Sequence, residues 1–143
     1  MGRALRILLA EDNPGDVFLV REALRRNFIE HELTVAKDGR SAWDLIEAAD
    51  GSGTEGFDIF MLDLNLPART GLELLSRIRG GRGNIADALI VILTSSNWSK
   101  DRMSAERDGA DYYFLKPSTL DGLLQIGNII AQLWSERSAP RGY

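Results

Sequence analysis

The chain has 143 residues, of which 44% are hydrophobic, and this suits one compact domain with a single core. Its net charge of −4 argues against direct DNA binding, because phosphate backbones are bound by clustered Lys and Arg. The absence of cysteine excludes disulfides, thiolate metal sites and cysteine nucleophiles, and the single histidine, His31, cannot build a multi-histidine metal site.

The N-terminal apolar run is far too short to cross a bilayer, and acidic residues follow it at once. We therefore expect a cytoplasmic protein with no signal peptide and no membrane segment. Five apolar runs alternate with helical patterns along the chain, and the first, third and fourth are apolar at successive positions, as in strands covered on both faces. The predicted strands span residues 4–10, 32–36, 57–63, 88–94 and 111–116.

The first and third helices have their own start signals. Asn13 is placed as an N-cap with Pro14 at the first helical position, and Thr70 with Glu73 forms a capping box for the third helix. The predicted buried positions of these helices are Val17, Val20, Leu24 and Phe28, then Ala42, Leu45, Ile46 and Ala49, then Leu75 and Ile78.

The C-terminal half is less regular. A mostly polar fourth helix is expected near 99–108. A fifth has its start signal in the motif Ser118-x-x-Asp121 and runs to about residue 135. Gly-rich segments at 50–56 and 79–83 are expected loops, and residues 136–143 a flexible tail. We therefore predict one domain over residues 1–143, with its core at about 5–135.

The strict (βα)5 order predicts an α/β fold with a doubly wound, five-stranded parallel sheet. Ligands of such sheets bind outside the carboxyl ends of the strands, where the strand order reverses. Four of the five predicted strands place a polar group at that edge: Glu11 and Asp12, then Asp63, Thr94 and Lys116.

Three carboxylates in one pocket repel one another unless a cation neutralises them, and Mg²⁺ suits hard oxygen ligands. Lys116 adds a positive charge and Thr94 a hydroxyl, which together fit a phosphoryl group. Each residue also has a purely structural explanation: Glu11 could cap a helix, Asp63 could belong to a turn, and Lys116 could be a surface charge. Their joint placement at one edge favours a site.

The order and spacing of these motifs resemble the receiver domain of two-component response regulators, over about residues 5 to 135. The likeness implies strand order 2-1-3-4-5. Four segments are similar in particular to single-domain receivers associated with bacterial phytochrome histidine kinases: "EDNPGDVFLVREAL", "LDLNLP", "LTSS" and "LWSE". The family motifs are Glu11-Asp12, Asp63 with Gly71 eight residues later, Thr94-Ser95 and Lys116-Pro117.

The resemblance implies that Asp63 accepts a phosphoryl group from a sensor histidine kinase, with a bacteriophytochrome as the candidate. Asp12, Asp63 and the backbone carbonyl of Asn65 would bind Mg²⁺, with Glu11 acting through a water molecule. Lys116 would pair with the phosphoryl oxygens. The chain would then be a signalling protein, not a conventional enzyme.

The resemblance also implies a switch. Thr94 would move to hydrogen-bond the phosphoryl group, the small Ser95 would leave room for that movement, and Tyr113 would fill the space behind Thr94. Alternation along the strand places Tyr112 and Phe114 on the face opposite Tyr113.

The last helix carries two apolar sectors when it is drawn as one continuous helix. Leu120, Leu123 and Leu124 share the first with Ala131 and Trp134. The second is a candidate interface for a homodimer or a kinase, with burial inside the chain as the alternative. A homodimer would use the fourth helix, fifth strand and fifth helix. The interface candidates are Ile126, Ile129 and Leu133.

Three other functions compete with a stand-alone phosphorylated receiver. A flavodoxin-like nucleotide binder would need a Ser/Thr/Gly-rich loop after the first strand, where this chain has acids. A metal-dependent aspartyl phosphatase would carry a second Asp where Asn65 stands. A degenerate receiver acting only as a docking scaffold is disfavoured by the intact set of polar residues.

Overall fold

The computed structural model describes residues 4–50 and 56–138, and its centre is a parallel five-stranded sheet. The strand order is β2-β1-β3-β4-β5, which confirms the prediction. The strands are β1 (Leu5–Ala10), β2 (His31–Ala36), β3 (Ile59–Leu62), β4 (Leu89–Thr94) and β5 (Tyr112–Leu115).

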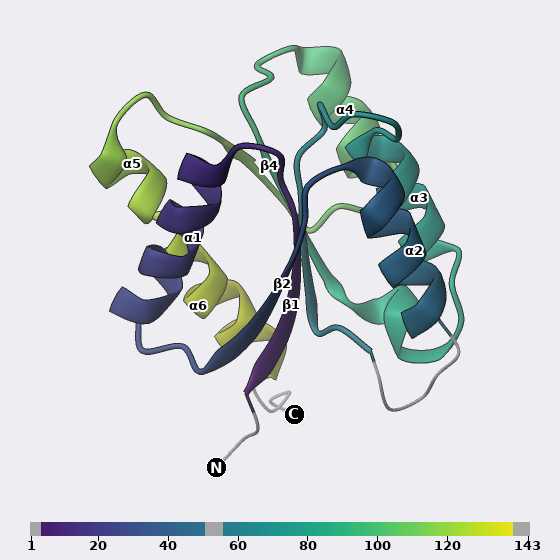
Figure 1. The fold of residues 1–143 in the computed structure, drawn as a ribbon, viewed down its shortest axis with the longest axis horizontal. Helices are drawn as coiled ribbons and strands as arrows, with labels where there is room; N and C mark the ends of the chain where they lie inside the picture. The colour runs from purple at the N-terminus through teal and green to yellow at the C-terminus, as the bar shows by residue number, and fades with distance from the viewer. Residues whose placement is uncertain (1–3, 51–55, 139–143) are drawn as a thin grey trace.

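Helices cover both faces of the sheet (Figure 1). One layer holds α1 (Pro14–Arg26), α5 (Leu120–Leu124) and α6 (Ile126–Ser138). The other holds α2 (Gly39–Ala49), α3 (Gly71–Arg79), α4 (Ser99–Arg107) and the short 3₁₀ helix η1 (Gly83–Asp87). The sheet thus separates two apolar cores, and every residue of β3 and β4 is buried, as successive apolar positions predict.

Two of the predicted helix starts are confirmed. Asn13 Oδ1 accepts hydrogen bonds from the N–H groups of Gly15 and Asp16, and the Thr70 side chain accepts one from the Glu73 N–H. The start predicted at Ser118 is wrong by one residue, because Thr119 is the N-cap.

The ends of the helices also differ from the prediction. The last helix divides into α5 and α6 at Gln125, and α6 continues to Ser138, so the predicted tail begins inside a helix. Residues 139–143 lie outside the described residues, as does most of the loop predicted at 50–56. No helix among the described residues is long and apolar enough to span a membrane.

Phe28 does not belong to the buried stripe of α1. The helix ends at Arg26, and Phe28 lies beyond it with φ of 55° and with 93% of its surface exposed. Its N–H donates to the Arg25 carbonyl and closes the last turn, and this position turns its side chain away from the core.

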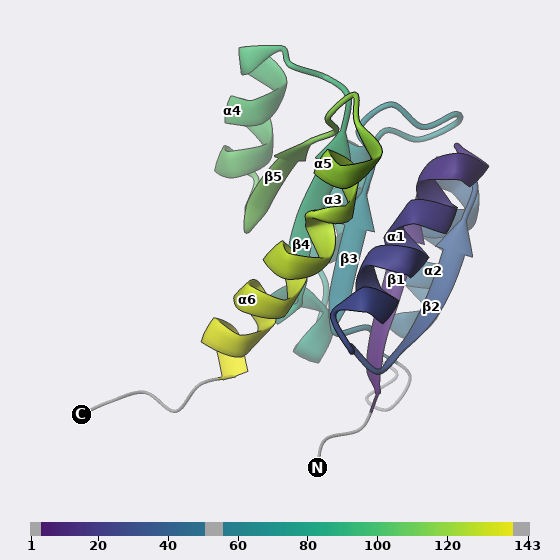
Figure 2. The same cartoon turned by 90° about the vertical axis from the view of Figure 1, so that its left-hand side faces the viewer.

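The prediction that Ile126 belongs to an exposed interface is wrong. Ile126 is fully buried in the core between α1, α5, α6 and the sheet, and Ile129 and Leu133 pack partly buried against the same core. Leu120, which belongs to the first apolar sector of the predicted last helix, is 65% exposed. The angular spacing of residues along a helix therefore does not decide which of its apolar sectors packs against the sheet, since α6 buries Ile126 and Ile130 while α5 leaves Leu120 exposed. Figure 2 shows α5 and α6 following one another along this face of the sheet.

We expect Ile126→Val to lower the free energy of unfolding by about 1 kcal/mol, because it removes a methyl group from a closed core. The same substitution at the half-buried Ile129 should cost less than half as much. Urea unfolding measures both. Equal costs at the two positions would contradict the assignment of Ile126 to the core.

Candidate functional site

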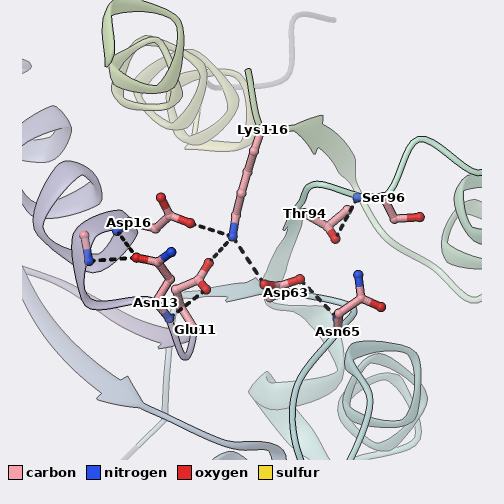
Figure 3. Close-up of polar contacts among 9 residues, drawn as sticks. Glu11, Asn13, Asp16, Asp63, Asn65, Thr94, Ser96 and Lys116 are labelled. Carbon is pink, nitrogen blue, oxygen red and sulfur yellow. Dashed lines mark hydrogen bonds and ion pairs between the residues drawn. The ribbon is translucent and has the colours of Figure 1, made fainter. Parts of the chain in front are cut away.

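Glu11, Asp63, Thr94 and Lys116 meet at the carboxyl edge of the sheet (Figure 3). Backbone hydrogen bonds extend the sheet and hold three of them there. The Glu11 N–H donates to the Ala36 carbonyl at 2.9 Å, and the Asp63 N–H to the Ala10 carbonyl at 3.0 Å. The Lys116 N–H donates to the Thr94 carbonyl at 2.7 Å. Their side chains therefore leave the ends of β1, β3 and β5 into one cleft of roughly 530 Å³.

Three carboxylates converge in this cleft. Glu11, Asp12 and Asp63 each offer an oxygen, and these oxygens all lie within 4.8 Å of one another. Glu11 is 1% exposed and Asp63 6% exposed, whereas Asp12 lies at the surface. Clustered carboxylate oxygens on a solvent-facing edge suit a hard divalent cation such as Mg²⁺, which keeps part of its water shell.

Lys116 supplies the neutralising charge among the acids. Its Nζ lies 2.6 Å from Glu11 Oε1, 2.8 Å from Asp16 Oδ2 and 3.2 Å from Asp63 Oδ2. The lysine side chain is only 11% exposed, so water screens these contacts weakly. The ammonium is thus fixed beside Asp63 by three carboxylates from three different elements.

The same contacts shift two pKa values. Burial raises the pKa of Glu11 to about 7, although its contacts with Lys116 oppose this rise. Burial alone would lower the pKa of Lys116, but hydrogen bonds to Asp16 and Glu11 and the charge of Asp63 outweigh it and raise this pKa above its usual value. Lys116 is therefore charged throughout the physiological range.

Asp16 is the residue at this site that sequence reasoning missed. The motif "NPGD" places it in the first turn of α1, where an acid is expected on helix-dipole grounds alone. In the structure, its carboxylate turns toward the cleft and contacts Lys116. The sequence did contain a signal for this role. The first turn of the helix after β1 lies at the same edge as the strand ends, so an acid in that turn is placed near the site.

The loop between β3 and α3 shapes the surroundings of Asp63. Asp63 Oδ1 accepts a hydrogen bond from the Asn65 N–H at 3.1 Å. The N-terminus of α3 approaches so closely that a Cβ on Gly71 would lie 2.3 Å from the Asp63 carbonyl oxygen. Only glycine fits there, which explains its place in the motif.

The predicted switch residues lie at the end of β4 and on β5. Thr94 is fully buried, and its Oγ1 accepts a hydrogen bond from the Ser96 N–H at 3.3 Å. The Tyr113 hydroxyl donates to the Ser96 carbonyl at 2.8 Å, and burial raises the pKa of this tyrosine. Ser95 is exposed and lines the cleft. Phe114 packs in the core on the opposite face, as strand alternation predicts.

Known proteins are similar to this chain in sequence and in fold. The sequence model of the response regulator receiver domain matches residues 7–128. Response regulator Rcp1 of Synechocystis sp. is 30% identical over 131 residues, which cover 91% of this chain and 88% of Rcp1.

Solved structures agree with the sequence matches. The phosphorylated cyanobacterial phytochrome response regulator RcpA superposes with a TM-score of 0.83 at 28% identity, over 96% of this chain and 98% of RcpA. The Mn²⁺-bound form of Rcp1 gives a TM-score of 0.81 at 28% identity, over 96% of this chain and 99% of Rcp1.

Proposed function

The chain belongs to the response regulator receiver domain family, and we propose that it is a stand-alone phosphoacceptor whose Asp63 takes a phosphoryl group from a sensor histidine kinase. The observation that carries the proposal is the position of Asp63. Its buried carboxylate lies 3.2 Å from the Lys116 ammonium and within 4.8 Å of carboxylate oxygens of Glu11 and Asp12, in an open cleft. This is the arrangement that phosphoryl transfer to a carboxylate requires.

In the proposed reaction, an Asp63 oxygen attacks the phosphorus of a phosphohistidine. The new O–P bond forms as the P–N bond breaks, and the imidazole nitrogen leaves with the electron pair. Asp12, Asp63 and the backbone carbonyl of Asn65 would bind Mg²⁺, with Glu11 acting through water, and the bound metal offsets the repulsion between two anions. Lys116 pairs with the phosphoryl oxygens.

The readout proceeds through Thr94. In the structure its hydroxyl is held by the Ser96 N–H, on the segment that also binds the Tyr113 hydroxyl. A phosphoryl oxygen offers Thr94 a stronger, charged acceptor, so Thr94 turns toward Asp63. Ser95 leaves room for this movement, and Tyr113 follows into the space behind it.

The proposed phosphodonor and the proposed mode of signalling are those that the similar proteins support. The similar protein RcpA is a cyanobacterial phytochrome response regulator, and this likeness supports a bacteriophytochrome histidine kinase as the phosphodonor in the cytoplasm. Output would be by protein contacts, without DNA binding. Pairing with a second copy stays a prediction, and the exposed large apolar side chains of α4, β5 and α5 are Met103, Tyr112, Leu115 and Leu120.

Two competing functions lose support at this site. The segment after β1 and the first turn of α1 line the cleft with Glu11, Asp12 and Asp16, and without a metal these acids repel the phosphate of a nucleotide or flavin. An aspartyl phosphatase of the expected pattern needs a second acid two residues after the nucleophile. Asn65 occupies that position, and its backbone N–H is bonded to Asp63.

Incubation with Mg²⁺ and acetyl phosphate should add the mass of one phosphoryl group to the intact chain. A histidine kinase that carries phosphohistidine should produce the same product faster. Intact-protein mass spectrometry at neutral pH measures the fraction labelled. A wild-type chain that both donors leave unlabelled would contradict the proposed function and leave only a docking role.

A further inference from the structure

Asp16 and Lys116 form a contact that no step of the proposed reaction uses. The Asp16 carboxylate lies 2.8 Å from Lys116 Nζ, on the α1 side of the ammonium, while Asp63 lies on the other side (Figure 3). The Asp16 side chain is 20% exposed, so the contact is shielded and is more than a surface ion pair.

Local structure fixes Asp16 in that position. Asn13 Oδ1 accepts hydrogen bonds from the N–H groups of Gly15 at 2.8 Å and of Asp16 at 3.2 Å, and these bonds anchor the first turn of α1. Pro14 restricts the backbone at the start of that turn. The carboxylate therefore reaches Lys116 from a rigid helix start.

The contact matters because Lys116 and a metal ion would share the same oxygens. Glu11 and Asp63 contact the ammonium and also belong to the carboxylate cluster that suits Mg²⁺. Two cations on one pair of carboxylates repel each other. Asp16 lies outside that cluster and gives the ammonium a partner of its own.

We propose that Asp16 is a positioning residue that holds the Lys116 ammonium on the α1 side of the cleft when Mg²⁺ binds beside Glu11 and Asp63, which the ammonium also contacts. Without Asp16, the ammonium has only the metal-facing carboxylates as partners, and Mg²⁺ has to displace it. The proposal rests on the metal site of the proposed function but not on phosphorylation.

A double-mutant cycle tests the proposal with Mg²⁺ alone. Mg²⁺ affinity is measured by isothermal titration calorimetry for wild type, Asp16→Asn, Lys116→Met and the double variant, without any phosphodonor. Asp16→Asn should weaken Mg²⁺ binding about 3- to 10-fold when Lys116 is present, which is an ordinary coupling between groups in contact. In the Lys116→Met background, where no ammonium competes, it should change affinity less than about twofold.

Two outcomes would overturn the proposal. Equal weakening in both backgrounds would mean that Asp16 acts on the metal by its own charge, and no weakening in either would mean that it has no effect on the site. Asp16→Ser is a second neutral variant with a good first-turn residue, and circular dichroism checks that α1 is intact. Failure of acetyl phosphate labelling would leave this cycle measurable, so the two proposals fail independently.

Discussion

Replacing Asp63 with Asn should abolish phosphorylation by acetyl phosphate, leaving the chain at its unmodified mass. The amide is not a nucleophile at neutral pH, while its shape and its acceptor for the Asn65 N–H are kept. The fold should survive, because the substitution removes one of three clustered acids and thereby some of their repulsion. Intact-protein mass spectrometry after incubation with Mg²⁺ and donor gives the result directly.

A matched control separates loss of the acceptor from a general effect of removing an acid. Asp38 is the N-cap of α2, where its side chain accepts a hydrogen bond from the Ser41 N–H, and Asn caps helices equally well. Asp38→Asn should label like wild type. A label that persists on Asp63→Asn would place the phosphoryl group on another residue and refute the assignment.

The parallel sheet and its carboxyl edge could be predicted from patterns that local interactions do not override, whereas the strand order came from the resemblance to receiver domains. Apolar runs separated by capped helices leave few topologies, and the parallel order then places all carboxyl strand ends together. Glu11, Asp63 and Lys116 needed no knowledge of side-chain contacts to be assigned to one cleft, and Thr94 is fully buried at the end of β4.

The errors arose where a result depends on tertiary packing or on a single hydrogen bond. Helical spacing shows that the last helix has two apolar sectors but not which one meets the sheet, and in the structure Ile126 is buried and Leu120 exposed. Thr119 caps α5 instead of Ser118, and an isolated sequence offers both hydroxyls equally. Phe28 follows the spacing of a helical stripe but lies past the end of the helix.

The role of Asp16 was missed for a related reason. An acid in the first turn of a helix is favoured by the helix dipole whatever it touches, so its presence gives no sign of a site. Only the three-dimensional position of the Lys116 ammonium, 2.8 Å away, distinguishes the two explanations.

The stability of the metal-free protein should fall as pH rises, and Glu11→Gln should remove that fall. The pKa of Glu11 is raised from 4.5 to about 7 in the folded state, mainly by burial. Between these two values the folded chain holds a proton that the unfolded chain has lost. The free energy of unfolding therefore decreases as pH rises from 4.5 to 7 and, for this group, is flat above 7.

The measurement is the difference in unfolding free energy between Glu11→Gln and wild type in EDTA, from urea titrations at pH 5, 6, 7 and 8. This difference should grow in favour of the variant and reach about 2 to 3 kcal/mol at pH 8, from the size of the shift. Taking a difference cancels the contribution of titrating groups that do not interact with Glu11. The same substitution at the exposed Glu32 should give no such trend.

Mg²⁺ should reverse the ranking of the two proteins. A cation that binds the folded wild type stabilises it by mass action and compensates the buried charge of Glu11, whereas Gln at this position offers the site one anion fewer. At pH 8 and millimolar Mg²⁺, wild type should therefore equal or exceed Glu11→Gln in stability. A difference independent of both pH and Mg²⁺ would show that Glu11 is a structural cap. It would contradict the prediction that Mg²⁺ compensates the buried charge of Glu11.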